Sequence, residues 1–248
     1  MSFRNLLLFA SILGTASCST SVPMSTEESA RLAFENAKNY QDSARYELAL
    51  EKFNYVKNKF PFTTYAVDAE LEIANTYYLQ TEYTQAIAAY QSFKELHPQH
   101  SQLAFVTYRI GDSYFLAAPG SVDRDLTPIK QGIQVFEDLI RRYPRSEYIK
   151  EAKEKIKFGR GLLAEREIYI GSFNYKKSFY KAAAFRFQNV LDRFSDAGHD
   201  AEAAYLLGES YRALEEMDQA KKAYQIAISK EADSEWAHKA ESRLKGLQ

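Results

Sequence analysis

Histidine and cysteine are the side chains of this sequence best suited to metal binding or nucleophilic chemistry. The chain has one cysteine, Cys18, and four histidines, His97, His100, His199 and His238. Their spacing matches no metal-binding motif such as HExxH, and Pro98 prevents His97 and His100 from sharing one helical face. Gly159 and Gly161 lie in a helical pattern without a preceding strand, which excludes a phosphate-binding loop. We therefore expect no catalytic residue, no metal site and no cofactor.

Cys18 follows a segment that has the three parts of a signal peptide. Arg4 supplies positive charge near the start, residues 6–13 are mostly apolar, and residues 14–17 are small. A bilayer-spanning helix needs roughly 20 apolar residues, so we expect residues 1–17 to be removed on export. A secretory peptide with an incidental cysteine is the alternative, but the chain has no second cysteine that could pair with Cys18.

Residues 14–18 resemble the lipobox of bacterial lipoproteins, with Thr15 where that motif prefers leucine. The resemblance implies that Cys18 is lipidated and becomes the first residue of the mature chain. Ser19 then implies the outer membrane of a Gram-negative cell, with the protein on its periplasmic face. Residues 18–28 are expected to form a lipidated N-terminal tether, and stable anchoring takes more than one acyl chain.

The composition narrows the class of partner. Lys and Arg number 32 against 33 Asp and Glu, and this balance argues against a nucleic-acid partner, which would need a basic face. The chain has 18 Tyr and 16 Phe but only 10 Gly and 6 Pro. We therefore expect a helical protein whose rings pack between helices or line a binding surface.

Three segments share one pattern of aromatic and alanine residues. They are Tyr46-x-x-Ala49-x-x-x-Phe53, Tyr83-x-x-Ala86-x-x-x-Tyr90 and Tyr180-x-x-Ala183-x-x-x-Phe187. A small alanine lets two helices cross closely, and an aromatic residue one turn later fills the next layer. Pro61 and Pro98 lie 37 positions apart, and each is expected to end the helix before it.

The pattern resembles the tetratricopeptide repeat, a helix-turn-helix unit with small, aromatic and proline positions. The resemblance implies an all-α fold, an α-solenoid of about five such repeats with a C-terminal capping helix at 234–247. Residues 117–128 read as an insertion in the third repeat, and the first helix of the fourth is expected from about 147 to 170. We therefore expect repeats one to three in 29–146, and repeats four and five with the capping helix in 147–248.

A superhelix of helix pairs has a concave face lined by the first helix of each repeat. Counting along these helices predicts a peptide-binding set of eight residues: Arg31, Phe34, Lys38, Leu71, Asn75, Tyr78, Phe105 and Tyr108. Such a surface fits an extended peptide with aromatic side chains, whose terminal carboxylate could bind Arg31, Lys38 and Asn75. The alternative is that each ring packs against the next repeat.

Asp123, Arg124 and Asp125 lie in the insertion of the third repeat. Their charges could bind a partner or could cap the following helix. Thr127 is the expected N-cap of that helix, with Pro128 at its first position.

A lipobox, five tetratricopeptide-like repeats and this insertion together resemble the BamD family, lipoproteins of the machinery that inserts β-barrels into the outer membrane. Residues 123–148 carry the strongest likeness. The resemblance implies docking of the C-terminal repeats on the BamA barrel insertase, with Arg186 taking part. It also implies that the N-terminal repeats receive C-terminal targeting segments of unfolded outer-membrane proteins, and that other assembly lipoproteins are partners. A periplasmic repeat lipoprotein that scaffolds cell-division or peptidoglycan enzymes, or that holds a hydrolase, is the alternative.

Overall fold

The computed structural model describes residues 25–195 and 197–247. Cys18, the expected signal peptide 1–17 and most of the tether 18–28 therefore lie outside the described residues. The described part of the chain contains eleven helices and no strand, which confirms the all-α prediction. The helices are α1 (Thr26–Asp42), α2 (Tyr46–Lys59), α3 (Thr64–Leu79), α4 (Tyr83–Leu96), α5 (Leu103–Ala117), α6 (Thr127–Arg142), α7 (Ile149–Lys176), α8 (Tyr180–Arg193), α9 (Asp200–Ala213), α10 (Met217–Lys230) and α11 (Glu235–Lys245).

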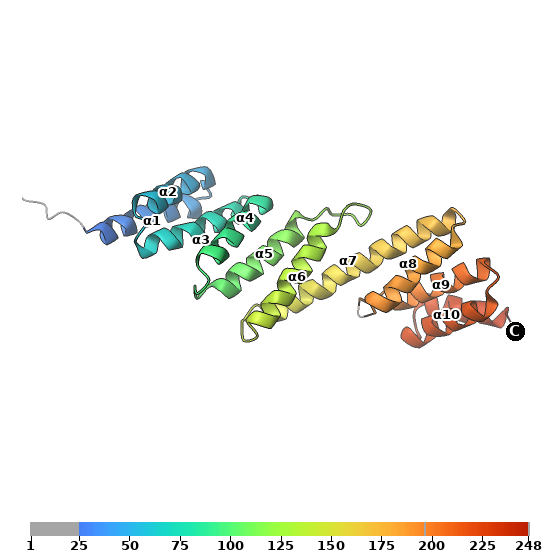
Figure 1. Ribbon diagram of the computed structural model, residues 1–248. Helices are drawn as coiled ribbons and strands as arrows, with labels where there is room; N and C mark the ends of the chain where they lie inside the picture. Colours follow the sequence, from blue (N-terminus) through green and yellow to red (C-terminus); the bar gives the residue numbers. More distant parts are fainter. Residues whose placement is uncertain (1–24, 196, 248) are drawn as a thin grey trace, which may run out of the picture.

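The helices form consecutive antiparallel pairs, and each pair packs on the next. Figure 1 shows the pairs following one another in an elongated array, from α1 and α2 at one end to α9 and α10 at the other. The long α7 packs against both α6 and α8 and so connects the third repeat to the fourth. α11 packs on the last pair, α9 and α10, and is the predicted capping helix. No described helix has both the length and the apolar character needed to cross a bilayer.

The repeated aromatic and alanine pattern forms the core. Ala49, Ala86 and Ala183 are fully buried, and so are the rings four positions later. In the first helix of a repeat, glycine stands in place of alanine where an aromatic ring packs very close to the backbone. At Gly208 a Cβ atom would lie 2.5 Å from Cε1 of Tyr224, so only glycine admits that ring.

Four of the repeats turn from the first to the second helix in the same way. Ala44, Thr81, Ser178 and Glu215 each take a left-handed conformation there, with φ between 55° and 64°. In the first repeat the amide of Arg45 donates to the carbonyl of Tyr40 at 2.8 Å, and that of Ala44 donates to Gln41 at 2.9 Å. This pair of bonds is a Schellman motif, which satisfies the last carbonyls of the helix.

The third repeat replaces this turn with the predicted insertion, now residues 118–126. Arg166 of α7 donates to the carbonyl of Val122 at 2.9 Å and to that of Arg124, so the loop is fastened to α7. Thr127 is not the N-cap, because α6 already begins with it. Instead Asp125 accepts from the Thr127 amide at 3.0 Å and from its hydroxyl at 2.7 Å.

α7 is longer at its C-terminal end than predicted. It extends to Lys176 rather than about residue 170, since no proline intervenes and the left-handed turn comes only at Ser178, with φ 63°. Gly171 lies against the ring of Phe187, where a Cβ atom would meet Cε1 at 2.6 Å. This glycine therefore serves close packing of α7 on α8 rather than a turn.

A buried carboxylate joins the last three helices. Glu209 of α9 is 8 % exposed. It accepts from the Tyr224 hydroxyl at 2.5 Å, from Arg212 at 3.2 Å and from Arg243 of α11 at 2.9 and 3.1 Å. Burial alone would raise the pKa of Glu209, but the hydrogen bonds from Tyr224 and the two arginines hold it below the ordinary value of 4.5. The ionised carboxylate thus stabilises the packing of α11.

We expect Glu209→Gln to lower the free energy of unfolding by about 1–3 kcal/mol at pH 7, since it removes the charge that both arginines bind. The folded pKa lies below the unfolded one, so this contribution is present above pH 4.5 and is lost as the pH falls through the folded pKa. Urea unfolding followed by circular dichroism at pH 7 and at about pH 3 measures it. The exposed Glu241→Gln is the matched control. A difference from wild type that is the same at both pH values would contradict the expectation.

Candidate functional site

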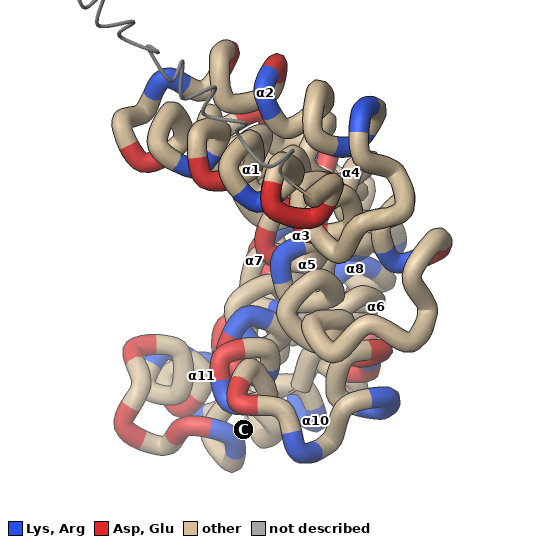
Figure 2. The backbone as a smooth tube through the Cα atoms, turned by 90° about the vertical axis from the view of Figure 1, so that its left-hand side faces the viewer, with Lys and Arg blue, Asp and Glu red and all other residues tan. Residues whose placement is uncertain are grey.

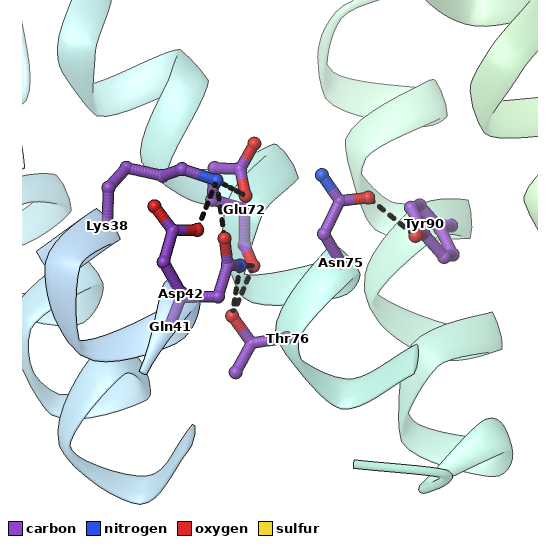
Figure 3. Close-up of polar contacts among 7 residues, drawn as sticks. All are labelled: Lys38, Gln41, Asp42, Glu72, Asn75, Thr76 and Tyr90. Carbon is purple, nitrogen blue, oxygen red and sulfur yellow. Dashed lines mark hydrogen bonds and ion pairs between the residues drawn. The ribbon is translucent and has the colours of Figure 1, made fainter. Parts of the chain in front are cut away.

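Polar contacts link the first helices of the N-terminal repeats. Lys38 of α1 pairs with Glu72 of α3 at 3.2 Å. One turn on, the Gln41 amide donates to the Thr76 hydroxyl at 2.8 Å, and Figure 3 shows both contacts on facing helices. Gln41 is 4 % exposed and Thr76 is fully buried, so this bond is part of the interface between repeats.

A second set of contacts joins α3, α5 and α7. The Tyr78 hydroxyl donates to Asp112 Oδ2 at 2.6 Å, and Lys155 Nζ donates to Asp112 Oδ1 at 2.7 Å. Burial, and then the bond to Asp112, raise the pKa of Tyr78 to about 12. The Tyr108 hydroxyl donates to Glu151 of α7. These bonds hold the N-terminal repeats to the start of the long helix.

The three residues predicted to bind a carboxylate all have partners within the chain. Arg31 pairs with Glu28 at 2.7 Å and with Glu35, both on α1. Lys38 is held by Glu72, as described above. Asn75 accepts from the Tyr90 hydroxyl at 2.6 Å, and Figure 3 shows this amide turned toward the α4 ring. A carboxylate ligand would have to compete with the acidic partners of Arg31 and Lys38.

The apolar members of the predicted set divide between core and surface. Leu71 and Tyr108 are 4 % and 7 % exposed and belong to the packed clusters between repeats. The ring of Phe34 packs against Phe53 and Tyr65, with ring centres 5.5 and 5.7 Å apart. Tyr78 and Phe105 are half-buried. These last two rings therefore remain accessible from the face formed by the first helices.

A groove of about 790 Å³ lies between α3, α5 and the turn that joins α6 to α7. Its lining is Glu72, Asn75, Ser101, Gln102, Ala104, Phe105, Tyr143, Pro144, Arg145, Ser146, Glu147 and Tyr148. Phe105 and Tyr148 form an aromatic wall, with ring centres 6.0 Å apart, and Tyr148 also stacks on Tyr108 at 4.9 Å. The groove thus combines rings with amide, hydroxyl and charged groups.

Of the predicted peptide-binding set, Asn75 and Phe105 line this groove. Sequence reasoning missed the turn 143–148 and Arg109. The count followed the first helices alone, whereas the turn follows a second helix. Arg109 stands four positions after Phe105, so the same helical count would have placed it on that face.

Arg186 lies on α8 and pairs with Glu167 of α7, at 3.2 Å. Glu167 also accepts from Asn189 at 3.4 Å. The Arg186 side chain is 37 % exposed, so it keeps contact with solvent. α7 and α8, with the residue before α8, carry exposed aromatic side chains: Phe158, Tyr169, Phe173, Phe179 and Phe185.

The charged residues of the insertion make local contacts. Asp123 accepts from the Ser121 hydroxyl, and Asp125 accepts from Thr127. These hydrogen bonds, more than any cation, hold the pKa of both carboxyls below the usual range. Asp123, Arg124 and Asp125 are all exposed. The aspartates can therefore make these local contacts and still bind a partner.

The rest of the charged surface is mixed in sign. In Figure 2 acidic and basic residues alternate along the tube, and neither sign fills the visible side. Within residues 25–195 and 197–247, no group of three or more metal-ligating side chains is placed to hold a metal ion.

The sequence matches known proteins over most of its length. The YfiO family, described as "Outer membrane lipoprotein", matches residues 26–226. The outer membrane protein assembly factor BamD of Rickettsia prowazekii (strain Madrid E) is 30% identical over 207 residues, which cover 84% of this chain and 82% of that protein. BamD of Neisseria meningitidis serogroup B (strain MC58) is 27% identical, over 73% of this chain and 72% of that protein.

Among solved structures, the TPR2AB domain of yeast Sti1, in a complex with pHSP90, has a TM-score of 0.45. It is 15% identical and is matched over 88% of this chain and 85% of that one. The match to the family extends from the start of α1 into α10 and so includes the groove, the insertion and Arg186. The chain belongs to the YfiO family of outer membrane lipoproteins, the family of the BamD assembly factors.

Proposed function

We propose that this protein is a non-catalytic lipoprotein of a β-barrel assembly complex in the outer membrane. It docks on a BamA-like insertase and binds C-terminal targeting segments of unfolded outer-membrane proteins. The observation that carries the proposal is the aromatic groove on the face of the first helices, in a chain whose relatives are named outer membrane protein assembly factors.

The groove supports the binding of an extended segment. An extended peptide is recognised by polar groups that bond its main chain and by pockets that take alternate side chains. Asn75, Gln102 and Ser146 supply polar groups along the groove, and Phe105 and Tyr148 supply an aromatic wall. Both kinds of contact are therefore present on one surface.

The surface of α7 and α8 supports docking on the insertase. Several large aromatic side chains are more than half exposed there, and exposed apolar patches mark sites of protein association. Arg186 is a cation on this surface that could exchange its contact with Glu167 for an acidic group of the partner. Asp123, Arg124 and Asp125 offer a second contact, for the insertase or for other assembly lipoproteins.

The lipid anchor on Cys18 and the tether after it are the third part of the proposed function. Lipid on Cys18 anchors the protein to the periplasmic face of the outer membrane, after removal of residues 1–17, and the tether 18–28 ends in the first turn of α1. Confinement to the membrane raises the effective concentration of the protein near the insertase. Repeats one to three, in 29–146, then bind the segment, while residues 147–248 dock.

Arg186→Glu tests the docking site. The change places a carboxylate beside Glu167, so we expect at least about tenfold less insertase recovered by a tagged protein from detergent-solubilised membranes. Lys222→Glu makes the same charge change on the exposed face of α10 and is expected to recover as much insertase as wild type. Circular dichroism confirms that both variants stay helical.

Equal recovery of the insertase by wild type and Arg186→Glu would reject this residue as a contact. Recovery of peptidoglycan enzymes without the insertase would instead support the alternative scaffolding function.

A further inference from the structure

Arg109 holds an unusual position beside the groove. It lies on α5, one turn after Phe105, and its guanidinium is stacked over two rings. The distance from its Cζ atom to the ring centre is 4.3 Å for Tyr78 of α3 and 5.2 Å for Phe105. Stacking between α3 and α5 restricts the side chain to one place.

Arg109 also differs from its charged neighbours in having no carboxylate partner among the described residues. Lys38 pairs with Glu72 and Lys155 with Asp112. Both oxygens of Asp112 are already taken, by Tyr78 and Lys155. The Nε atom of Arg109 is buried and has no hydrogen-bond acceptor.

The positive charge of Arg109 affects four tyrosines around it. Burial raises the pKa values of Tyr78, Tyr90, Tyr108 and Tyr148, and in each case the positive charge of Arg109 partly offsets that rise. Arg109 is half-buried, so part of its side chain still faces solvent. An anion that arrived at this face would meet a fixed cation in a partly desolvated setting, where charge-assisted hydrogen bonds are strong.

We propose that Arg109 binds the terminal α-carboxylate of the peptide segment that occupies the groove. This rests on the peptide-binding function proposed above and identifies the end of the segment that the groove recognises. The guanidinium fork matches a carboxylate in a two-bond geometry that a lysine cannot reproduce. Since Arg109 lies over Phe105, a bound carboxylate would be next to the aromatic wall of the groove.

The aromatic wall selects an α-carboxylate rather than an acidic side chain. A C-terminal aromatic residue carries its ring and its carboxylate within one residue, so the ring can pack on Phe105 and Tyr148 while the carboxylate reaches Arg109. An aspartate or glutamate inside the segment brings a carboxylate without a ring.

The test measures the affinity of the full-length protein for synthetic peptides by fluorescence anisotropy. The first peptide has ten residues with alternating apolar side chains, an N-terminal label and a C-terminal phenylalanine with a free carboxylate. The second is its C-terminal amide, and the third is the amide with glutamate next to the phenylalanine. We expect wild type to bind the free acid at least about tenfold more tightly than either amide.

Arg109→Gln is expected to remove this preference by weakening binding of the acid while leaving that of the amide unchanged. Arg109→Lys is expected to keep only part of it, because the charge stays but the fork is lost. Arg45→Gln is the matched control, since Arg45 also stacks on a tyrosine, with Cζ 4.9 Å from the Tyr40 ring centre. It should retain the wild-type preference.

The comparison of peptides on wild type needs no variant, so the proposal stays testable even if Arg109→Gln fails to fold. Equal affinity of wild type for the acid and the amide would overturn the role of Arg109 and leave peptide binding standing. Tight binding of the glutamate-containing amide would overturn the choice of an α-carboxylate. Failure of wild type to bind any of the three peptides would reject the peptide-binding function itself, and this inference with it.

Discussion

Replacement of Phe136 by alanine is expected to lower the free energy of unfolding by about 3–5 kcal/mol. The Phe136 ring is fully buried and lies against Tyr108 and Phe115, with ring centres 5.8 and 5.6 Å away. It also covers Gly111, where a Cβ atom would meet the ring at 2.7 Å. The side chain fills the space between α5 and α6, and a rigid repeat cannot close the cavity that its loss creates.

Urea unfolding of the full-length protein, followed by circular dichroism, measures this loss of stability. Phe62 is the matched control, because it is the same residue type in the turn between α2 and α3 and is fully exposed. Phe62→Ala should change the stability by less than about 0.5 kcal/mol. A comparable small change for Phe136→Ala would show that the third repeat is not held together by its aromatic layer.

Lys155→Met is expected to lower the free energy of unfolding by about 3 kcal/mol, although methionine fills a similar volume. Asp112 is 5 % exposed and would lose the cation that lies 2.7 Å from its carboxylate. The remaining bond from the Tyr78 hydroxyl does not balance a buried charge. The cost arises from the carboxylate left behind rather than from the lost lysine.

Two further variants isolate this cause. Lys153→Met makes the same change two residues away on α7, at an exposed position, and should be close to neutral. Asp112→Asn combined with Lys155→Met should recover much of the lost stability, because the amide carries no charge. Non-additivity in this double-mutant cycle measures the coupling. A double variant as unstable as the sum of the two single variants would show that the ion pair is not the cause.

The repeat pattern was enough to predict most of the fold. An alanine and an aromatic residue one turn later determine which face of a helix is buried, and Ala86 and Tyr90 are buried as that spacing requires. The loop in the third repeat and the helix that begins after Ser234 were predicted for the same reason, since Pro, Gly and Ser interrupt a helical period. Local sequence determines these features, so they can be predicted from one sequence.

The candidate site was less predictable, because its contacts join residues far apart in the chain. Lys38 and Glu72 are separated by 34 positions and Lys155 and Asp112 by 43. Helical counting shows which face a lysine occupies but not which carboxylate faces it across the interface. It therefore assigned Lys38 to a ligand and overlooked Arg109, which stacks on Tyr78 and has no acidic partner among the described residues.

The length of α7 limits what the protein can bind at both ends at once. Its 28 residues make a rod about 42 Å long. The groove lies at the start of this rod, and Arg186 pairs with Glu167, which lies about 27 Å along it. An extended polypeptide covers about 3.3–3.6 Å per residue, so a segment that reached from one site to the other would need about 8 extended residues. Because the groove is proposed to bind the client segment and Arg186 the insertase, the length of α7 determines how far apart the protein holds these two partners.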